Sequence, residues 1–265
     1  MYKDLKIDSE LLKLANEAEK ELEEIYSHYE ENSLLNSAKV LSAFQKFMVS
    51  GTDFCEITGY GYSDAGRDKL EQIYADIFKA EDALVRPQIM SGTHALSLTF
   101  FGLLKHGDTM ISITGTPYDS LKGVIGIEGD SRNSLIANGV KYEEIDLIDN
   151  DFDIETIKTR LSKNDVKLVE IQRSRGYSQR KSLTIEKIER VIKAIREVNK
   201  EVIIMIDNCY GDFVEDKEPI EVGADIIANC VGALTRYGNG KPMIVIDFGT
   251  ATRSEERRVG KECYS

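Results

Sequence analysis

The stretch that decides the fold is residues 203–215, which read IIMIDNCYGDFVE. Its apolar run has the length and the isoleucine content of a buried strand, and Asp207 stands where that strand should end. Upstream, an apolar run at 84–89 precedes Ser91-Gly92-Thr93-His94, which opens an apolar segment of helical length at 92–104. The sequence therefore places polar side chains where apolar strands stop.

Strands and helices alternate along the chain up to this stretch. Two helices, at 8–30 and 33–49, and a loop rich in Gly and Tyr at 51–66 come before the alternation. This order predicts an α/β fold with a mostly parallel sheet and helices on both of its faces. The expected strands are 84–89, 110–114, 140–145, 167–172 and 202–207, and the expected helices are 67–80, 92–104, 117–125, 153–162 and 184–198.

Composition excludes several classes of function. The 265 residues carry a net charge of −12, which argues against nucleic-acid binding because that binding needs cations against phosphate. No apolar run reaches membrane-spanning length, and we expect a cytoplasmic protein without a signal peptide. The four cysteines are scattered, so we expect reduced thiols and no metal site. They are Cys55, Cys209, Cys230 and Cys263, and Cys209 is more typical of a small buried residue than of a reactive one.

The turn Ser91-Gly92-Thr93 is a candidate phosphate site. A helix N-terminus offers free N–H groups and the positive end of the helix dipole, and Gly92 lets the backbone approach a ligand closely. The hydroxyl groups of Ser91 and Thr93 could add contacts. The alternative is that Ser91 only caps the helix. His94 and His28 have no partner that the sequence identifies, and His94 is more typical of a structural residue.

Asp207 and Tyr118 are candidates for contacts with a cofactor ring. A carboxylate beside a pyridine nitrogen keeps that nitrogen protonated, although an Asp-Asn pair also caps turns. Tyr118, in Thr116-Pro117-Tyr118-Asp119 after a strand, could lie flat on a ring; packing beneath a loop is the commoner use of an aromatic residue.

Three arginines occupy the segment QRSRGYSQR at 172–180, in a loop after a strand. Arginine binds carboxylates and phosphates through two parallel hydrogen bonds, and in so acidic a chain Arg173, Arg175 and Arg180 favour anion binding over a merely solvated loop. Ligands of parallel sheets bind at the carboxyl ends of strands, where the candidates described above also lie. A phosphate-binding helix start with an acid on a central strand suggests a site for pyridoxal 5′-phosphate.

The same segments resemble the methionine gamma-lyase-like family, whose members are often called aluminium resistance proteins and belong to the fold-type-I pyridoxal-phosphate enzymes. The resemblance runs from the N-terminus to about residue 226, with several long motifs in the family's order. They are GYGYSDAGRDKLEQIYA (59–75), RPQIMSGTHAL (86–96), ITGTPYDSL (113–121), IQRSRGYSQRKSLTI (171–185) and IDNCYGDFVEDKEPIEVGAD (206–225).

The resemblance implies a role for each candidate residue. Phosphate contacts would come from the Ser91-Gly92-Thr93 turn, Tyr118 would cover the ring face, and Asp207 would pair with the pyridine nitrogen. Arg173 and Arg175 would bind a substrate carboxylate or make structural contacts. Related enzymes complete the phosphate site from a neighbouring subunit, which implies a homo-oligomer; the candidates for that role here are Tyr60, Tyr62 and Arg67.

For an intact family member the resemblance implies a carbon–sulfur lyase that acts on a small sulfur-containing amino acid. A lysine holds the cofactor, gives way to the substrate amine and moves the proton. The family motif places that lysine at position 233, where this chain has Ala233. We therefore expect the chain to be inactive, or to bind the cofactor weakly and non-covalently. Lys241, in GNGKP before a strand, is the alternative attachment point, and a surface lysine is the simpler interpretation.

Residues 221–252 resemble type III pantothenate kinases. The pentapeptide EVGAD occurs in both families, and the kinases' phosphate-binding turn DFGTAT is matched by Asp247, Gly249, Thr250 and Thr252. Ile226 departs from the kinases, which have Arg after EVGAD. RSEERRVGKEC at 253–263 resembles translated sequencing-adapter DNA. Three resemblances in tandem suggest a chimeric sequence.

We therefore expect three parts. These are an N-terminal helical segment at 1–60, an incomplete cofactor-binding large domain at 61–226 and a non-native-looking tail at 227–265. A truncated large domain would expose apolar surface and favour aggregation. Two other functions remain open, namely a type III pantothenate kinase fragment and a non-catalytic binding protein.

Overall fold

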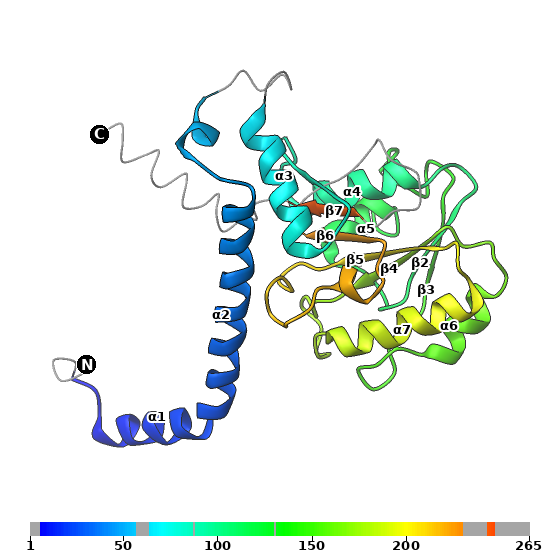
Figure 1. The fold of residues 1–265 in the computed structure, drawn as a ribbon. Helices are drawn as coiled ribbons and strands as arrows, with labels where there is room; N and C mark the ends of the chain where they lie inside the picture. The colour runs from blue at the N-terminus through cyan, green and yellow to red at the C-terminus, as the bar shows by residue number, and fades with distance from the viewer. Residues whose placement is uncertain (1–5, 57–63, 87, 130, 230–242, 247–265) are drawn as a thin grey trace.

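One sheet of seven parallel strands forms the centre of the structure, in the order β1-β7-β6-β5-β4-β2-β3 (Figure 1). The computed structural model describes residues 6–56, 64–86, 88–129, 131–229 and 243–246. The strands are Asp82–Val85 (β1), Thr109–Ser112 (β2), Lys141–Glu144 (β3), Leu168–Gln172 (β4), Ile203–Asp207 (β5), Ile226–Asn229 (β6) and Met243–Ile246 (β7). Their order and parallel pairing confirm the predicted fold class.

Helices cover both faces of this sheet, and a further pair of helices extends away from it (Figure 1). The α-helices are Ser9–Glu21 (α1), Glu23–Lys46 (α2), Ala65–Phe78 (α3), Gly92–Leu103 (α4), Asp119–Ile125 (α5), Ile154–Leu161 (α6) and Ile185–Val198 (α7). Two short 3-10 helices, Gly51–Phe54 (η1) and Pro219–Val222 (η2), complete the described elements. None of the helices described is both long enough and apolar enough to cross a membrane.

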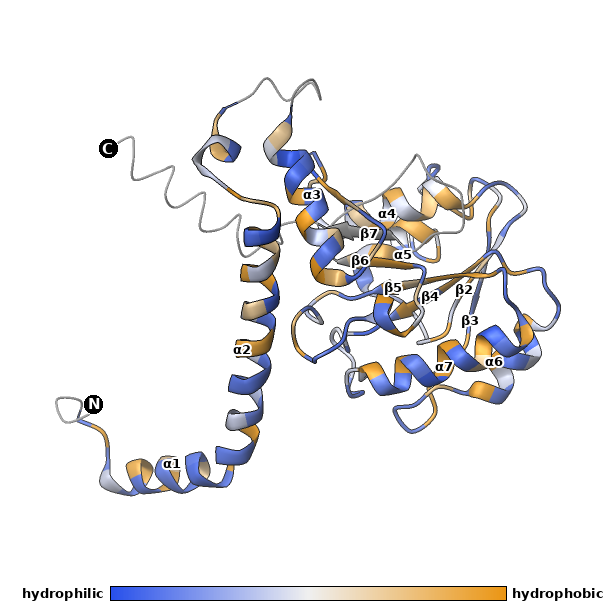
Figure 2. Ribbon diagram, viewed as in Figure 1, coloured by the Kyte–Doolittle hydropathy of each residue, from blue (hydrophilic) through white to orange (hydrophobic). Residues whose placement is uncertain are grey.

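The face covered by α6 and α7 follows directly from the sequence pattern. In α7 the residues at spacings of three and four are apolar and buried, while charged residues occupy the opposite side, as the colours of Figure 2 show. They pack on the isoleucine and valine side chains of β2, β4 and β5. The buried positions of α7 are Ile185, Ile188, Val191, Ile192 and Ile195.

The opposite face is covered by α4 and α5. Phe100 of α4 and Ile125 of α5 are fully buried against Met110, Leu168 and Met205 of the sheet. Because side chains alternate between the two faces of a strand, the last inward position of β5 on this face is Asp207. Helices α4 and α5 both begin near that edge, so the fold gathers two helix starts above the polar strand ends.

The N-terminal helices differ from the expected spans 8–30 and 33–49. Helix α1 ends at Glu21, and α2 then continues without a break from Glu23 to Lys46, because residues 23–46 contain no Gly or Pro. Asn32 and Asn36 donate side-chain hydrogen bonds from α2 to backbone carbonyls of the loop at 213–215. Strand β6 was not among the expected strands, whereas β7 lies where a strand was expected after Lys241.

Phe100→Ala should lower the free energy of unfolding by about 3–5 kcal/mol, because a fully buried ring leaves a cavity that the packed sheet cannot close. Phe101→Ala, the same change one position along α4 at a side chain that is 43% exposed, is the matched control and should cost far less. Urea unfolding followed by circular dichroism measures both. Equal losses for the two variants would contradict this packing of α4.

Candidate functional site

The start of α4 has the geometry of an anion-binding site. Ser91 is extended (φ −171°), and its hydroxyl oxygen accepts a hydrogen bond from the N–H of His94 at 3.2 Å. The first bond within the helix runs from the N–H of Ala95 to the carbonyl of Ser91, so the N–H groups of Gly92 and Thr93 precede the helical ladder. Such groups suit a phosphate.

His94 stabilises the turn before this helix. Its ring Nδ1 accepts a hydrogen bond from the N–H of Met90 at 3.1 Å. A second contact joins the two helix starts, because the hydroxyl groups of Thr93 and Ser120 lie 2.6 Å apart. These contacts favour a structural role for His94 and give Thr93 a partner that sequence reasoning did not identify.

One cavity of about 270 Å³ brings the predicted cofactor residues together. Its walls come from the N-terminus of α4, the start of α5, the loop after β4 and the end of β5. Ser91, Gly92, Thr93, Tyr118 and Asp207 all line it. The sequence did not single out the other polar or small residues of its walls, which are Ser120, Ser174, Gly176 and Tyr210.

Asp207 is a buried carboxyl group at the floor of this cavity. It ends β5 in register with Gln172 of β4, and its residue is 4% exposed. Burial raises the pKa of Asp207 to about 6, while a hydrogen bond from the N–H of Cys209 at 3.1 Å opposes that rise. At neutral pH the group is therefore ionised, and a cation beside it would stabilise it further.

Tyr118 is held in place mainly through Gln172. The N–H of Tyr118 donates to Oε1 of Gln172 at 2.7 Å, and Nε2 of Gln172 donates to the carbonyl of Ser174 at 3.0 Å. Gly176 has φ +55°, and a Cβ there would lie 3.3 Å from the Tyr118 ring. A hydrogen bond with the hydroxyl of Tyr177 raises the pKa of Tyr118 to about 12, so the phenol stays neutral.

Arg173 makes structural contacts and does not line the cavity. Its guanidinium donates to the carbonyl of Leu183 at 3.2 Å, to the carbonyl of Gly211 at 2.8 Å and to Oδ1 of Asn208 at 2.8 Å, and it pairs with Glu215 at 2.6 Å. These bonds join the ends of β4 and β5 to the start of α7. Of the two roles expected for Arg173, the geometry favours the structural one.

Arg175 and Arg180 line a neighbouring cavity of about 370 Å³, which shares Tyr118 and Gly176 with the first. Arg180 donates to the carbonyl of Gln172 at 2.8 Å, so its guanidinium braces the loop. Arg175 is exposed. Of the three arginines, Arg173 is buried, Arg180 stabilises the loop through its hydrogen bond, and Arg175 is accessible to solvent.

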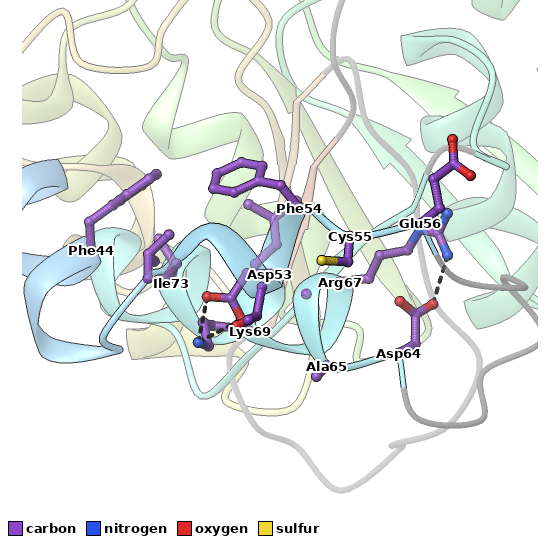
Figure 3. Close-up of a pocket in the computed structure, with 14 residues that line it drawn as sticks. Phe44, Asp53, Phe54, Cys55, Glu56, Asp64, Ala65, Arg67, Lys69 and Ile73 are labelled. Atoms are coloured by element: carbon purple, nitrogen blue, oxygen red, sulfur yellow. Dashed lines mark hydrogen bonds and ion pairs between the residues drawn. The ribbon is translucent and has the colours of Figure 1, made fainter.

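Arg67 lies apart from both cavities, in a third cavity of about 550 Å³ beside η1 and α3 (Figure 3). There it pairs with Asp64 at 2.8 Å, and Lys69 pairs with Asp53 at 2.7 Å. This chain does not bring Arg67 to its own candidate site. Several sequence candidates lie outside the described residues: Tyr60, Tyr62, Ala233, Lys241, Asp247, Gly249, Thr250 and Thr252.

Arg173→Ala should destabilise the fold by about 2–4 kcal/mol, because it leaves the carbonyls and Asn208 without their donor, although Glu215 is partly exposed. Arg175→Ala, two residues along in the same loop, should change stability little because its side chain is exposed. Chemical denaturation of both variants measures the difference. A stable Arg173→Ala variant would argue against the structural role.

Comparisons with known proteins agree with this architecture. YnbB of Bacillus subtilis (strain 168) is 43% identical over 232 residues, which cover 87% of this chain and 54% of that protein. A crystal structure from Clostridium acetobutylicum, described as a candidate cystathionine beta-lyase involved in aluminum resistance, is 47% identical with a TM-score of 0.82. The match covers 86% of this chain and 55% of the other. The chain thus spans about half the length of these relatives.

Two other matches concern the fold and the C-terminal part. The pyridoxal-5′-phosphate dependent protein YhfS from Escherichia coli shares the fold at 19% identity and a TM-score of 0.56. A type III pantothenate kinase of Acidobacterium capsulatum is 68% identical over 34 residues, only 13% of this chain, which confirms a short kinase-like stretch. The methionine gamma-lyase family model matches residues 11–241, so the chain belongs to the methionine gamma-lyase family.

Proposed function

We propose that the cavity between α4, α5 and the end of β5 binds pyridoxal 5′-phosphate, and that a complete site of this kind cleaves a carbon–sulfur bond in a small amino acid. One observation carries the proposal: the N-terminus of α4 and the buried carboxyl of Asp207 line the same cavity. An anion site facing a buried acid matches a ligand with a phosphate at one end and a basic ring nitrogen at the other.

The phosphate would sit on the first turn of α4. The N–H groups of Gly92 and Thr93 and the hydroxyls of Ser91 and Ser120 all border the cavity. The charge of the phosphate is balanced only by the helix dipole and N–H donors, because no lysine or arginine is among the described residues that line this cavity. A cation from a neighbouring subunit, for which Arg67 is a candidate, would complete that balance.

Asp207 would hold a proton on the ring nitrogen. The carboxylate is ionised at neutral pH, since the pKa raised by burial is about 6, and it lines the cavity at the end of a central strand. A bound pyridoxal phosphate withdraws electrons from the substrate carbon next to the amine, and a protonated ring nitrogen strengthens that withdrawal. Tyr118, oriented by Gln172, would pack on the ring and exclude water from one face.

No lysine is among the described residues that line this cavity, so none of them could attach the cofactor covalently and move the proton. The family motif has a lysine at position 233, where this chain has Ala233. Lys241 is the alternative attachment point. We therefore propose that this chain binds the cofactor non-covalently and has little or no lyase activity. A non-catalytic binding protein is the second candidate, and it is favoured if the natural locus also lacks the lysine.

A kinase function is supported only by the short match to type III pantothenate kinases. We propose instead that the C-terminal part reflects a chimeric sequence. Amplifying and resequencing the locus from source DNA tests this; an uninterrupted amplicon that encodes the same C-terminus would refute it.

Asp207→Asn should weaken binding of 4′-deoxypyridoxine 5′-phosphate by about tenfold or more at neutral pH, because the ring cation loses its counter-charge. This ligand keeps the ring nitrogen and the phosphate but has no aldehyde to react with surface lysines. Asp119→Asn, at the same sheet edge but outside the cavity walls, is the matched control and should bind like wild type. Isothermal titration measures both; unchanged affinity of Asp207→Asn would remove the proposed site.

Borohydride reduction in the presence of pyridoxal 5′-phosphate, followed by peptide mass spectrometry, should yield no stoichiometric adduct at one site, because the expected lysine is absent. A single stoichiometric adduct on Lys241, with cofactor absorbance lost in Lys241→Ala, would show that the chain attaches the cofactor by another route.

A further inference from the structure

Glu170 is a second carboxyl group on the face of the sheet that carries Asp207. It lies in β4, in register with Ser112 of β2 and Met205 of β5. Alternation along the strand places Leu168, Glu170 and Gln172 on the side covered by α4 and α5. Asp207 lies one strand across and two positions further along, so Glu170 sits one layer beneath the cavity floor.

Burial and bonding make Glu170 unusual. The residue is 0% exposed, and neither carboxyl oxygen has a hydrogen-bond partner within the described part of the chain. The nearby hydroxyl of Ser112 donates instead to the carbonyl of Gly115 at 2.7 Å. The helical side of this layer is apolar, with Leu96 and Phe100 of α4 in its core. An ionised carboxylate is costly in such surroundings, whereas an uncharged acid is tolerable.

The charged and titratable groups around Glu170 point the same way. Burial raises the pKa of Glu170 to about 8, the charge of Asp207 raises it further, and the charge of Glu144 from β3 adds to the rise. The Ser112 hydroxyl and the more distant Arg180 oppose the rise. Burial raises the pKa of Tyr142 on β3, and the charge of Glu170 contributes to that rise. At neutral pH Asp207 is therefore ionised, while Glu170 keeps its proton.

We propose that Glu170 is a positioning residue that acts through Asp207, by holding a proton until a protonated pyridine ring pairs with Asp207 and then releasing that proton to water. This inference rests on the proposed function. The O–H bond of Glu170 breaks, its electron pair stays on the carboxylate, and no other bond or electron moves. The ring cation offsets the charge of Asp207, so the second carboxylate no longer faces an unbalanced neighbour.

The physical reason is electrostatic coupling across one strand. Asp207 is a cause of the raised proton affinity of Glu170, and a cation against Asp207 removes much of that cause. The release leaves the buried layer with one net negative charge, as it has before the ring cation binds. Because Glu170 holds the proton before binding, the charge of the pair lies on Asp207, where the ring nitrogen can meet it.

The first test counts protons. The full chain is titrated with 4′-deoxypyridoxine 5′-phosphate in dilute buffer with a pH dye, at about pH 7.5, between the two raised pKa values. Glu170→Gln should release roughly half to three quarters of a proton fewer per bound ligand than wild type. Proton uptake by the ring itself is common to both proteins and cancels. Glu186→Gln, the same change at an exposed position of α7 on the opposite face of the sheet, is the control and should match wild type.

The second test needs no ligand. The folded protein keeps the proton of Glu170 up to about pH 8, whereas the unfolded chain loses it near its ordinary value of 4.5, so wild-type stability falls as pH rises across that window. Glu170→Gln should flatten this fall, by roughly 5 °C in melting temperature between about pH 5.5 and pH 8. Glu170→Met repeats the test if the amide variant folds poorly.

The outcomes separate the two proposals. If wild type does not bind the ligand, or binds it independently of Asp207, the proposed function fails and this inference fails with it. If binding depends on Asp207 but the proton count is the same in wild type and Glu170→Gln, the cofactor site stands and this inference is overturned. An unchanged pH dependence of melting would show that Glu170 is already ionised and would also overturn it.

Discussion

The candidate site depends on one constraint: a parallel sheet that is covered on both faces tolerates an ionised carboxyl group only where a strand is about to leave that cover. Asp207 occupies that position at the end of β5, with the start of α4 across the cavity from it. Two residues earlier the same face holds Met205 with Glu170 beside it on β4, and Leu168 lies one layer deeper in the apolar core. The acid is therefore buried enough to bind a cation strongly, yet reachable from the cavity.

Buried polar side chains near this acid hold the neighbouring loop in place through hydrogen bonds. Arg173, Asn208 and Glu218 form a buried network in which Asn208 accepts from Arg173 at 2.8 Å and donates to Glu218 at 3.3 Å. Burial raises the pKa of Glu218 to about 7, so the charge of Glu218 in this network changes with pH near neutrality. This network holds the loop that follows Asp207. The position of the carboxyl group is therefore fixed by strand pairing before it and by the loop contacts after it.

Local signals in the sequence predicted the parallel sheet and placed the candidate residues at the ends of its strands. An apolar run that ends on Asp207, and Ser91-Gly92 before a helical run, are each visible within a few residues. The role of Arg173 was not decidable in this way, because Asn208 and Glu215 lie 35 and 42 residues further along the chain. Glu170 was hidden for a related reason: within KLVEIQ it looks like one polar residue in a strand, and only the packing of α4 shows that its side faces a core.

The two buried acids and the phosphate together define the pH range in which the cavity suits its proposed ligand. A phosphate ester gains its second charge near pH 6, where Asp207 with its raised pKa of about 6 also becomes ionised. Above about pH 8 Glu170 loses its proton even without a cation nearby, which places a second negative charge beneath the floor. A cavity without a covalent link relies more heavily on these charges and on the dipole of α4, so we expect its affinity to depend on pH more steeply than that of a site with a lysine.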